Sequence, residues 1–178
     1  MDAVTTARDR YHQLYVSSVD DVIRFISRRV PDTVVEDVVA EAFLTVWRRV
    51  EDLPADPSQA RAWLFGIARH CARNAVRGTS RQQALAVRIA DQPRTSVHAG
   101  AEASFDSINT RLDLATAWRR LAPDDQESLA LTVFDELTSP EAAQVLGITA
   151  PAYRVRLMRA RRALRRHLES TPAKEHTP

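Results

Sequence analysis

The residues with the clearest chemical potential lie in the last third of the chain, where arginine is concentrated and acid is absent. Residues 142–168 contain no aspartate or glutamate and seven arginines, namely Arg154, Arg156, Arg159, Arg161, Arg162, Arg165 and Arg166. Guanidinium groups bind phosphate oxygens and the edge of guanine through paired hydrogen bonds. The run therefore predicts a nucleic-acid interface, although a solvated basic helix has the same composition.

The spacing around these arginines indicates a helix-turn-helix. Apolar residues recur at helical intervals along the same segment, at Leu157, Ala160, Leu164 and Leu168. Upstream, residues 139–146 have a short helical pattern, Gly147 is placed for a turn, and Thr149-Ala150-Pro151 is typical of a helix start. A helix with an apolar seam can pack on a small domain while its arginines enter the major groove of DNA.

Charge is segregated along the rest of the chain. Residues 1–56 contain eleven acids and seven arginines, residues 57–90 contain six arginines and no acid, and residues 102–141 contain nine acids and three arginines. Two basic blocks separated by acidic ones indicate two contacts with one polyanion and acidic faces for protein partners. Of the 25 basic residues 24 are arginine, which suits phosphate binding and equally fits a GC-rich genome.

The elements that position these residues are predicted to be helices. Only four glycines occur in 178 residues, and 3.6-residue periodicity recurs along the chain. We expect an all-α protein with two small helical domains, residues 8–78 and 110–169. A flexible linker over residues 79–109 joins them and contains a short helix near residues 82–89.

Helix ends in the first domain can also be predicted. The sequence Thr33-Val34-Val35-Glu36 has the pattern of a capping box at the start of a second helix, whose apolar stripe is expected to run from Val35 to Trp47. The prolines of residues 53–58 require a loop, after which Ser58 could cap a third helix that ends before Gly78. Arg69, Arg73 and Arg77 are four residues apart, so we expect them to share one exposed face.

Catalysis has little support in the sequence. The five histidines are scattered, no Cys/His set has metal-ligand spacing, and no glycine-rich phosphate loop is present. Adjacent Asp124 and Asp125 suit the first turn of a helix after Pro123. The single Cys71 and the lack of an apolar run near eighteen residues favour a reducing, cytoplasmic location. We therefore expect a non-enzymatic protein with no cofactor and no metal.

Two stretches resemble a known family. Residues 37–47 (DVVAEAFLTVW), a proline-bearing loop and residues 61–69 (RAWLFGIAR) resemble region 2 of bacterial RNA polymerase sigma factors. Residues 121–168, with RARRAL at 159–164, resemble region 4. The short length without an intervening domain is similar to the extracytoplasmic-function (ECF) group. The resemblance implies a subunit that binds core RNA polymerase, recognises the −35 and −10 promoter elements and is nucleoid-associated when active.

The resemblance implies two protein partners. In the family, the second helix of region 2 docks on a coiled coil of the largest polymerase subunit, and region 4 meets the flap. The corresponding polymerase-binding residues are Asp37, Val38, Glu41, Ala42 and Arg48. Asp37 and Glu41 could equally serve only to solvate the helix. Members of the group are usually held inactive by an anti-sigma factor, so we expect one here. We expect no insertion into a membrane.

Residues for the −10 element follow from the same resemblance. The loop at residues 54–59 corresponds to a family loop that captures a flipped base, which costs a few kcal/mol of unstacking. The third helix would hold the separated strand. The candidates are Pro54, Ala55, Asp56, Ser58, Arg69, His70, Arg73, Asn74 and Arg77. His70 could hydrogen-bond to a base edge or be a surface residue without a DNA contact. Trp63 could stack on a base or pack in the core.

Residues for the −35 element lie on the arginine-rich helix. The matching positions are Arg154, Val155, Arg156, Met158, Arg159 and Arg162. The other arginines would meet phosphates or solvent. The sequence departs from the family pattern at Ala150-Pro151-Ala152-Tyr153 and at Val155, where Tyr153 and Val155 could contact thymine methyl groups or pack. An alternative is a conventional regulator that uses only this helix-turn-helix, with residues 1–78 as a dimerisation or sensor module.

Overall fold

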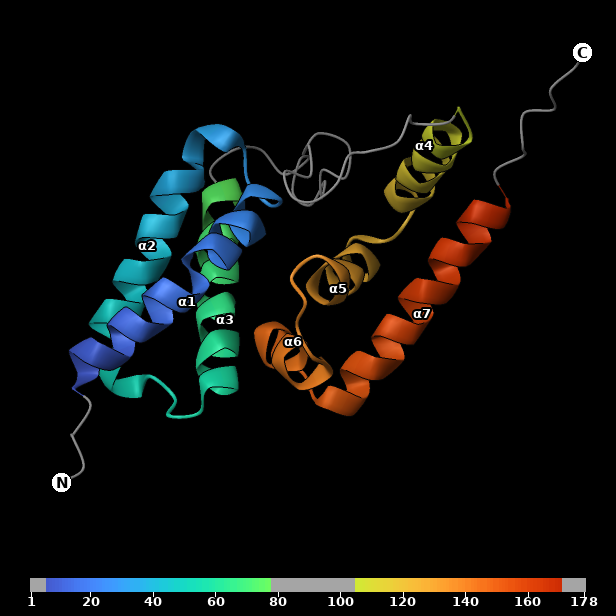
Figure 1. Cartoon of the computed structure of the whole chain (residues 1–178). Coiled ribbons are helices and arrows are strands. Elements are labelled where there is room, and N and C mark those ends of the chain that lie inside the picture. The colour runs from blue at the N-terminus through green and yellow to red at the C-terminus, as the bar shows by residue number, and fades with distance from the viewer. Residues whose placement is uncertain (1–5, 78–104, 171–178) are drawn as a thin grey trace, which may run out of the picture.

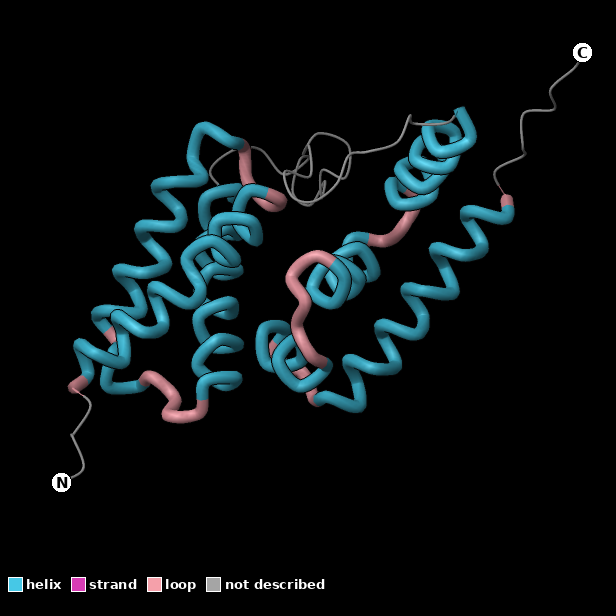
Figure 2. The backbone as a smooth tube through the Cα atoms, viewed as in Figure 1, coloured by secondary structure: helices cyan, strands magenta, loops and turns pink. Residues whose placement is uncertain are grey.

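The computed structural model describes residues 6–77 and 105–170, and within them it contains helices and connecting turns (Figures 1 and 2). The α-helices are α1 (Ala7–Ser27), α2 (Val35–Arg48), α3 (Pro57–Arg77), α4 (Phe105–Arg119), α5 (Pro123–Val133), α6 (Ser139–Leu146) and α7 (Ala150–Glu169). Two 3-10 turns, Asp32–Val34 and Val50–Asp52, flank α2. The predicted all-α class is confirmed over these residues. The helix predicted near residues 82–89 and the cap at Gly78 lie outside them.

Helices α1, α2 and α3 form the N-terminal unit, residues 6–77. Each helix has one apolar stripe, and the stripes meet in a core whose Phe25, Val46, Leu64 and Phe65 are fully buried. The rings of Phe25 and Phe65 meet edge to face, with centroids 5.0 Å apart, a favoured geometry for aromatic pairs. The core leaves the opposite face of α2 to solvent, whereas α3 also packs against α6 of the C-terminal unit.

Two predicted helix starts are wrong. Thr33 lies inside the Asp32–Val34 turn, so α2 begins after Val34, which makes no side-chain cap. At α3 the cap is Asp56, whose Oδ1 accepts from the Gln59 backbone N–H at 2.8 Å. The helix therefore begins two residues earlier than a cap at Ser58 would allow.

Helices α4 to α7 form the C-terminal unit, residues 105–170. Helix α4 begins at Phe105, inside the segment predicted as linker. Helix α5 begins at Pro123 and has Asp124 and Asp125 in its first turn, as predicted. A capping box that was not predicted opens α6, because Thr138 and Glu141 satisfy each other's backbone and side-chain groups.

The turn between α6 and α7 requires a left-handed residue. Gly147 has φ of 68°, and the N–H of Ile148 donates to the Ala143 carbonyl at 3.0 Å, as in a Schellman motif. Thr149 then caps α7, its Oγ1 accepting from the Ala152 N–H. The predicted helix-turn-helix therefore has Gly147 at the end of α6 and Thr149 at the start of α7.

We expect Gly147→Ala to destabilise the chain by about 1–2 kcal/mol, because an alanine at positive φ is strained although its Cβ would meet no atom within 4 Å. Gly66→Ala is the matched control. Its Cβ also meets nothing, but Gly66 lies inside α3, where alanine should stabilise by up to about 1 kcal/mol. Urea unfolding of both variants measures the difference, and equal effects would contradict the assignment of strain to the turn.

Tyr153 anchors α7 to α5. Its side chain is fully buried, and its hydroxyl donates to the Ser128 carbonyl at 2.8 Å and lies 2.6 Å from the Thr132 hydroxyl. Burial raises the pKa of the Tyr153 phenol, partly offset by the Thr132 hydrogen bond. The sequence left two alternatives for Tyr153, namely packing or a contact with a thymine methyl group. The side chain packs in the core, so the prediction of a thymine contact is wrong for Tyr153.

Tyr153→Phe should lower the free energy of unfolding by about 1–2 kcal/mol, because it removes buried hydrogen bonds without opening a cavity. Tyr15→Phe is the control, since the Tyr15 ring is exposed. Chemical denaturation monitored by circular dichroism compares the two. A Tyr153→Phe chain as stable as Tyr15→Phe would show that the apolar seam alone holds α7 in place.

Candidate nucleic-acid interface

The solvent-facing side of α7 presents most of the residues predicted for −35 recognition. Because Tyr153, Leu157 and Ala160 are buried, the residues between them point outward. The exposed members are Arg154, Val155, Met158, Arg159 and Arg162. Val155 and Met158 are 45% and 44% exposed. The face therefore combines guanidinium groups with two apolar contacts.

Arg156 is placed differently from its neighbours. Its guanidinium pairs with the Asp124 carboxylate at 2.5 Å, and its side chain is 29% exposed. Asp124 is in the first turn of α5, so this ion pair ties α7 to α5 at the surface. One nitrogen of the Arg156 guanidinium is therefore engaged by α5 in this structure.

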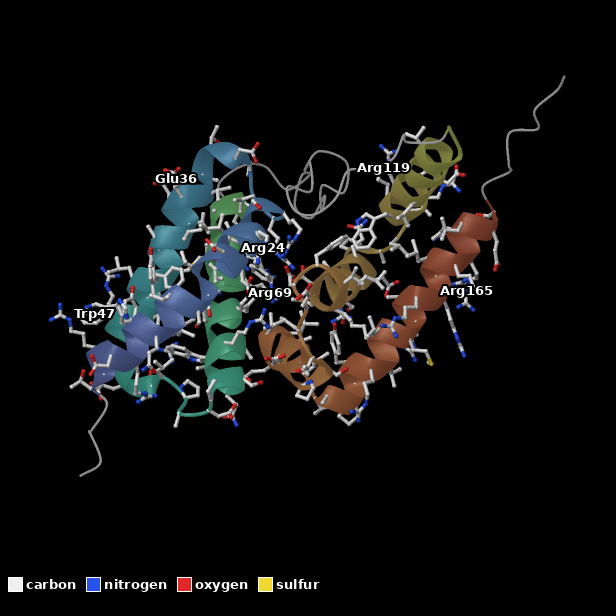
Figure 3. All side chains as sticks on the ribbon, in the orientation of Figure 1. Arg24, Glu36, Trp47, Arg69, Arg119 and Arg165 are labelled. Carbon is white, nitrogen blue, oxygen red and sulfur yellow. The ribbon has the colours of Figure 1, made fainter. Side chains whose placement is uncertain are left out.

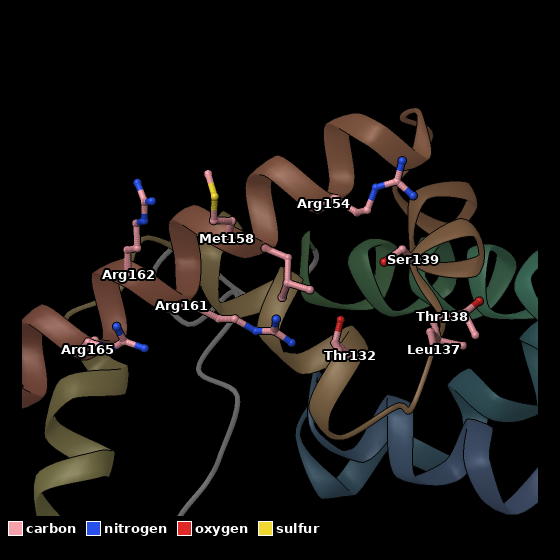
Figure 4. A pocket seen from close by; sticks show the side chains of 10 residues that line it. Thr132, Leu137, Thr138, Ser139, Arg154, Met158, Arg161, Arg162 and Arg165 are labelled. Carbon is pink, nitrogen blue, oxygen red and sulfur yellow. The ribbon is translucent and has the colours of Figure 1, made fainter.

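A basic groove of about 660 Å³ runs beside α7 (Figure 4). Its walls carry hydroxyl groups from α5 and the start of α6, and guanidinium groups from α7. The polar lining residues are Thr132, Thr138, Ser139, Arg154, Arg161, Arg162 and Arg165. Guanidinium and hydroxyl groups at this density suit phosphate oxygens. Arg161 and Arg165, predicted to meet phosphate or solvent, thus lie where a phosphate could be held.

A second exposed polar surface lies on α3 and the loop before it. Ala55, His70, Arg73, Asn74 and Arg77 are exposed, and Pro54 is partly exposed. Asp56 is exposed too, but its carboxylate is engaged as the α3 cap. Trp63 is half-buried, and the Arg49 guanidinium lies 5.3 Å from its ring centroid, so packing describes it better than an open stacking platform.

Two of the predicted −10 residues bond to the C-terminal unit: Arg69, which is partly buried, and Ser58, which is still exposed. Arg69, labelled in Figure 3, donates from Nε to Glu127 Oε1 at 3.3 Å, and Ser58 Oγ donates to Glu141 Oε1 at 3.0 Å. The expectation of one exposed face for Arg69, Arg73 and Arg77 is therefore wrong for Arg69. Eight residues advance an α-helix by slightly more than two turns, so Arg69 and Arg77 point in different directions.

The outer surface of α2 is the third candidate site. Asp37, Glu41 and Arg48 are exposed as predicted. Val38 and Ala42 are wrong as contact residues, because they are 3% and 0% exposed and belong to the core stripe that packs within the N-terminal unit.

Sequence reasoning missed two apolar residues on this outer surface. Leu44 and Trp47 are each 45% exposed, and Trp47 lies on the side of the N-terminal unit that faces away from α5 to α7 (Figure 3). Trp47 was expected in the buried stripe, whereas it packs edge to face on Tyr11 at 5.1 Å. The spacing 37, 41, 44 and 48 would have identified the exposed face, because these positions recur at helical intervals.

Family models match both units of the chain. Sigma-70 region 2 matches residues 14–82, and Sigma-70 region 4 matches residues 111–164. The first match covers the exposed α2 and α3 surfaces, and the second covers the helix-turn-helix. In the part of the chain that the structure describes, no helix is long and apolar enough to cross a membrane.

Individual proteins show the same relationship. The RNA polymerase sigma factor NccH of Alcaligenes xylosoxydans xylosoxydans is 33% identical over 80% of this chain and 77% of its own length. The ECF RNA polymerase sigma factor SigM of Bacillus subtilis is 27% identical over 88% of this chain and 92% of its own. The fold is similar to the sigma factor RpoE solved with the anti-sigma factor NepR from Bartonella quintana, with a TM-score of 0.60 at 22% identity over 92% of this chain and 99% of that one.

The two family models and a relative of this identity and coverage lead to one conclusion. The chain belongs to the sigma-70 family of RNA polymerase sigma factors, in its extracytoplasmic-function group.

Proposed function

We propose that this sigma factor divides promoter recognition among three surfaces: the outer face of α7 for the −35 element, α3 with its preceding loop for the −10 element, and the outer face of α2 for core polymerase. The observation that carries the proposal is the outward face of α7, where Arg154, Val155, Met158 and Arg159 stand together on a helix held by Tyr153. A recognition helix in the major groove needs such a mixed face.

The −35 contact combines reading and anchoring. An arginine that forms two hydrogen bonds with guanine contributes about 1–3 kcal/mol of discrimination. Arg154 and Arg159 are in position for this role, and Val155 and Met158 offer apolar contacts for thymine methyl groups. Arg162 lies at the edge of the groove that also contains Arg161 and Arg165, so these three suit phosphates.

Arg154→Ala should relax discrimination at one position of the −35 element, by about 1–3 kcal/mol, because a base contact is lost. Arg165→Ala should instead weaken matched and scrambled DNA alike and reduce the salt slope by about 1, because a phosphate contact is lost. Anisotropy titrations of the holoenzyme with both duplexes at several salt concentrations measure the two effects. Identical behaviour of the variants would remove the division between reading and anchoring.

The −10 contact is assigned to the N-terminal unit. Pro54 and Ala55 of the loop are accessible to an extruded base, and His70, Arg73, Asn74 and Arg77 extend the surface along α3. Successive phosphates of a single strand need a basic track, and His70 and Asn74 can offer hydrogen bonds to base edges. Ser58 is exposed and belongs to this surface although it bonds to Glu141, whereas Arg69 is partly buried against Glu127.

The polymerase contact is assigned to α2. Asp37, Glu41 and Arg48 provide charge, and exposed Leu44 and Trp47 provide the apolar centre that protein interfaces usually contain. A regulator that used only the helix-turn-helix would have no need of this surface. Promoter-dependent run-off transcription with purified core polymerase separates the two functions, because only a sigma factor makes new transcripts appear.

Reversing both charges, in Asp37→Arg with Glu41→Arg, should weaken core polymerase binding about tenfold or more, since two rim charges would repel a complementary partner. Both carboxylates are exposed, so folding should be retained. Fluorescence titration with core polymerase and run-off transcription measure the loss. The double variant Asp20→Arg with Glu51→Arg, which reverses exposed acids elsewhere on the same unit, is the control. Unchanged affinity of the α2 variant with a native circular dichroism spectrum would refute the assignment.

An anti-sigma factor is a further proposed partner, supported by the fold shared with RpoE, which was solved with NepR. An inhibitor that covered the exposed apolar and acidic face of α2 would block polymerase directly. In this function the chain acts in the cytoplasm, associates with the nucleoid during initiation, and needs no cofactor or bond chemistry of its own.

A further inference from the structure

A side chain from the start of α1 is bonded to the loop that precedes α3. The Arg10 guanidinium donates from Nη2 to the carbonyl oxygen of Leu53, 43 residues away. The Leu53 side chain is 5% exposed, and the residue directly precedes Pro54, the first residue of the loop assigned to the −10 element. Arg10 lies before residues 14–82, which match Sigma-70 region 2, so this bond comes from outside the family match.

Arg10 is itself held in place by its own helix and by α2. The Thr6 hydroxyl accepts from the Asp9 backbone N–H at 3.2 Å, as part of a capping box at the start of α1. The Arg10 N–H donates to the Thr6 carbonyl at 3.0 Å. The Tyr11 ring packs edge to face on Trp47, with centroids 5.1 Å apart. The first turn of α1 is therefore a fixed support, and it lies at the same end of the N-terminal unit as the loop (Figure 1).

The loop is held on both sides of its two accessible residues. On one side the Leu53 side chain is buried and its carbonyl is bonded to Arg10. On the other side the Asp56 carboxylate caps α3. Between them lie Pro54, whose ring restricts φ, and the exposed Ala55. A segment this short keeps little conformational freedom once both of its ends are held.

We propose that Arg10 is a positioning residue for recognition of the −10 element: it holds the Leu53 carbonyl so that Pro54 and Ala55 keep the conformation that receives an extruded base. Extruding a base costs free energy, and a loop that had to be ordered at the same moment would add to that cost. Arg10 acts through the backbone of the loop and needs no contact with DNA. This role rests on the proposed function of the loop, whereas the bond from Arg10 to Leu53 does not.

Loss of the Arg10 bond should affect one base position of the bound strand. Arg10→Met keeps an unbranched side chain but has no donor, so the Leu53 carbonyl loses a charge-assisted hydrogen bond. If the loop then has its receiving conformation about one tenth of the time, preference for the extruded base falls about tenfold. Arg10→Lys retains a cationic donor and should restore most of the preference. An arginine that bound a phosphate would instead weaken every sequence alike and reduce the salt slope by about 1.

Order in the loop can be measured by amide hydrogen exchange of the free full-length chain. Exchange over residues 50–56 should be faster in Arg10→Met than in the wild type, while exchange over the buried turns of α2 and α3 stays the same. Arg8→Met, which removes an exposed arginine of the same helix, is the matched control and should change neither. Unchanged exchange in the loop, or an equal rise across α1 to α3, overturns the role of Arg10 in positioning the loop.

Base preference is measured on the holoenzyme assembled with purified core polymerase. The probe is a pool of single-stranded oligonucleotides with a randomised centre, sequenced before and after capture. Ala55→Leu adds bulk at the exposed part of the loop and so identifies the position that the loop reads. Arg10→Met should flatten the preference at that same position by about tenfold. Arg10→Lys should restore it, and Arg8→Met should leave it unchanged.

Failure of the loop and failure of Arg10 give different profiles. A wild-type holoenzyme that enriches no base beyond core polymerase alone, or a profile that Ala55→Leu leaves unchanged, overturns the assignment of the loop to the −10 element. A profile that Ala55→Leu alters and Arg10→Met does not alter overturns only the role of Arg10. A uniform loss at all positions in Arg10→Met, with a smaller salt slope, also overturns that role, because Arg10 would then be a phosphate contact.

Discussion

The contact between the two units is built around one buried ion pair, Arg29 with Asp135. An arginine that is 3% exposed must keep a carboxylate partner, because neither water nor an apolar neighbour can replace it. The pair lies where the loop after α5 meets the end of α1, and α6 packs on α3 in the same contact between the units. The contact between the units also decides which arginines of α3 are accessible. Arg73 and Arg77 are exposed to solvent, whereas Arg69 is partly buried against Glu127. Accessibility of the candidate DNA surface is thus decided by a contact outside it.

The recognition helix shows how one segment can serve packing and recognition together. Tyr153, Leu157 and Ala160 bury one side of α7, and the alternating arginines leave the other side for a ligand. Tyr153, a departure from the family pattern, acts as an anchor whose hydroxyl is satisfied by α5. The departure therefore alters how α7 is held, and Val155, which stays exposed, is the position at which base preference can differ.

Much of the fold could be predicted because it rests on local chemistry. Pro123, Gly147 and Thr149 each mark a helix end through backbone geometry or a nearby hydrogen bond, and the structure has helix ends there. The wrong predictions concern choices between adjacent candidates. Asp56 and not Ser58 caps α3, and Val38 and Ala42 lie on the inner side of α2 while Trp47 lies on the outer side. Periodicity identifies a stripe, but the rotation of the stripe depends on the neighbouring helices.

The sequence by itself determined the all-α class, the helix-turn-helix and the arginine surface of α7, because these depend on residues within a few turns of one another. Only the tertiary structure decided that Arg156 pairs with Asp124, that Ser58 faces Glu141, and that Arg29 is buried with Asp135. These partners are 32, 83 and 106 residues apart. Nothing in local spacing distinguishes an arginine that will meet a phosphate from one that will meet a carboxylate, because the same guanidinium geometry serves both.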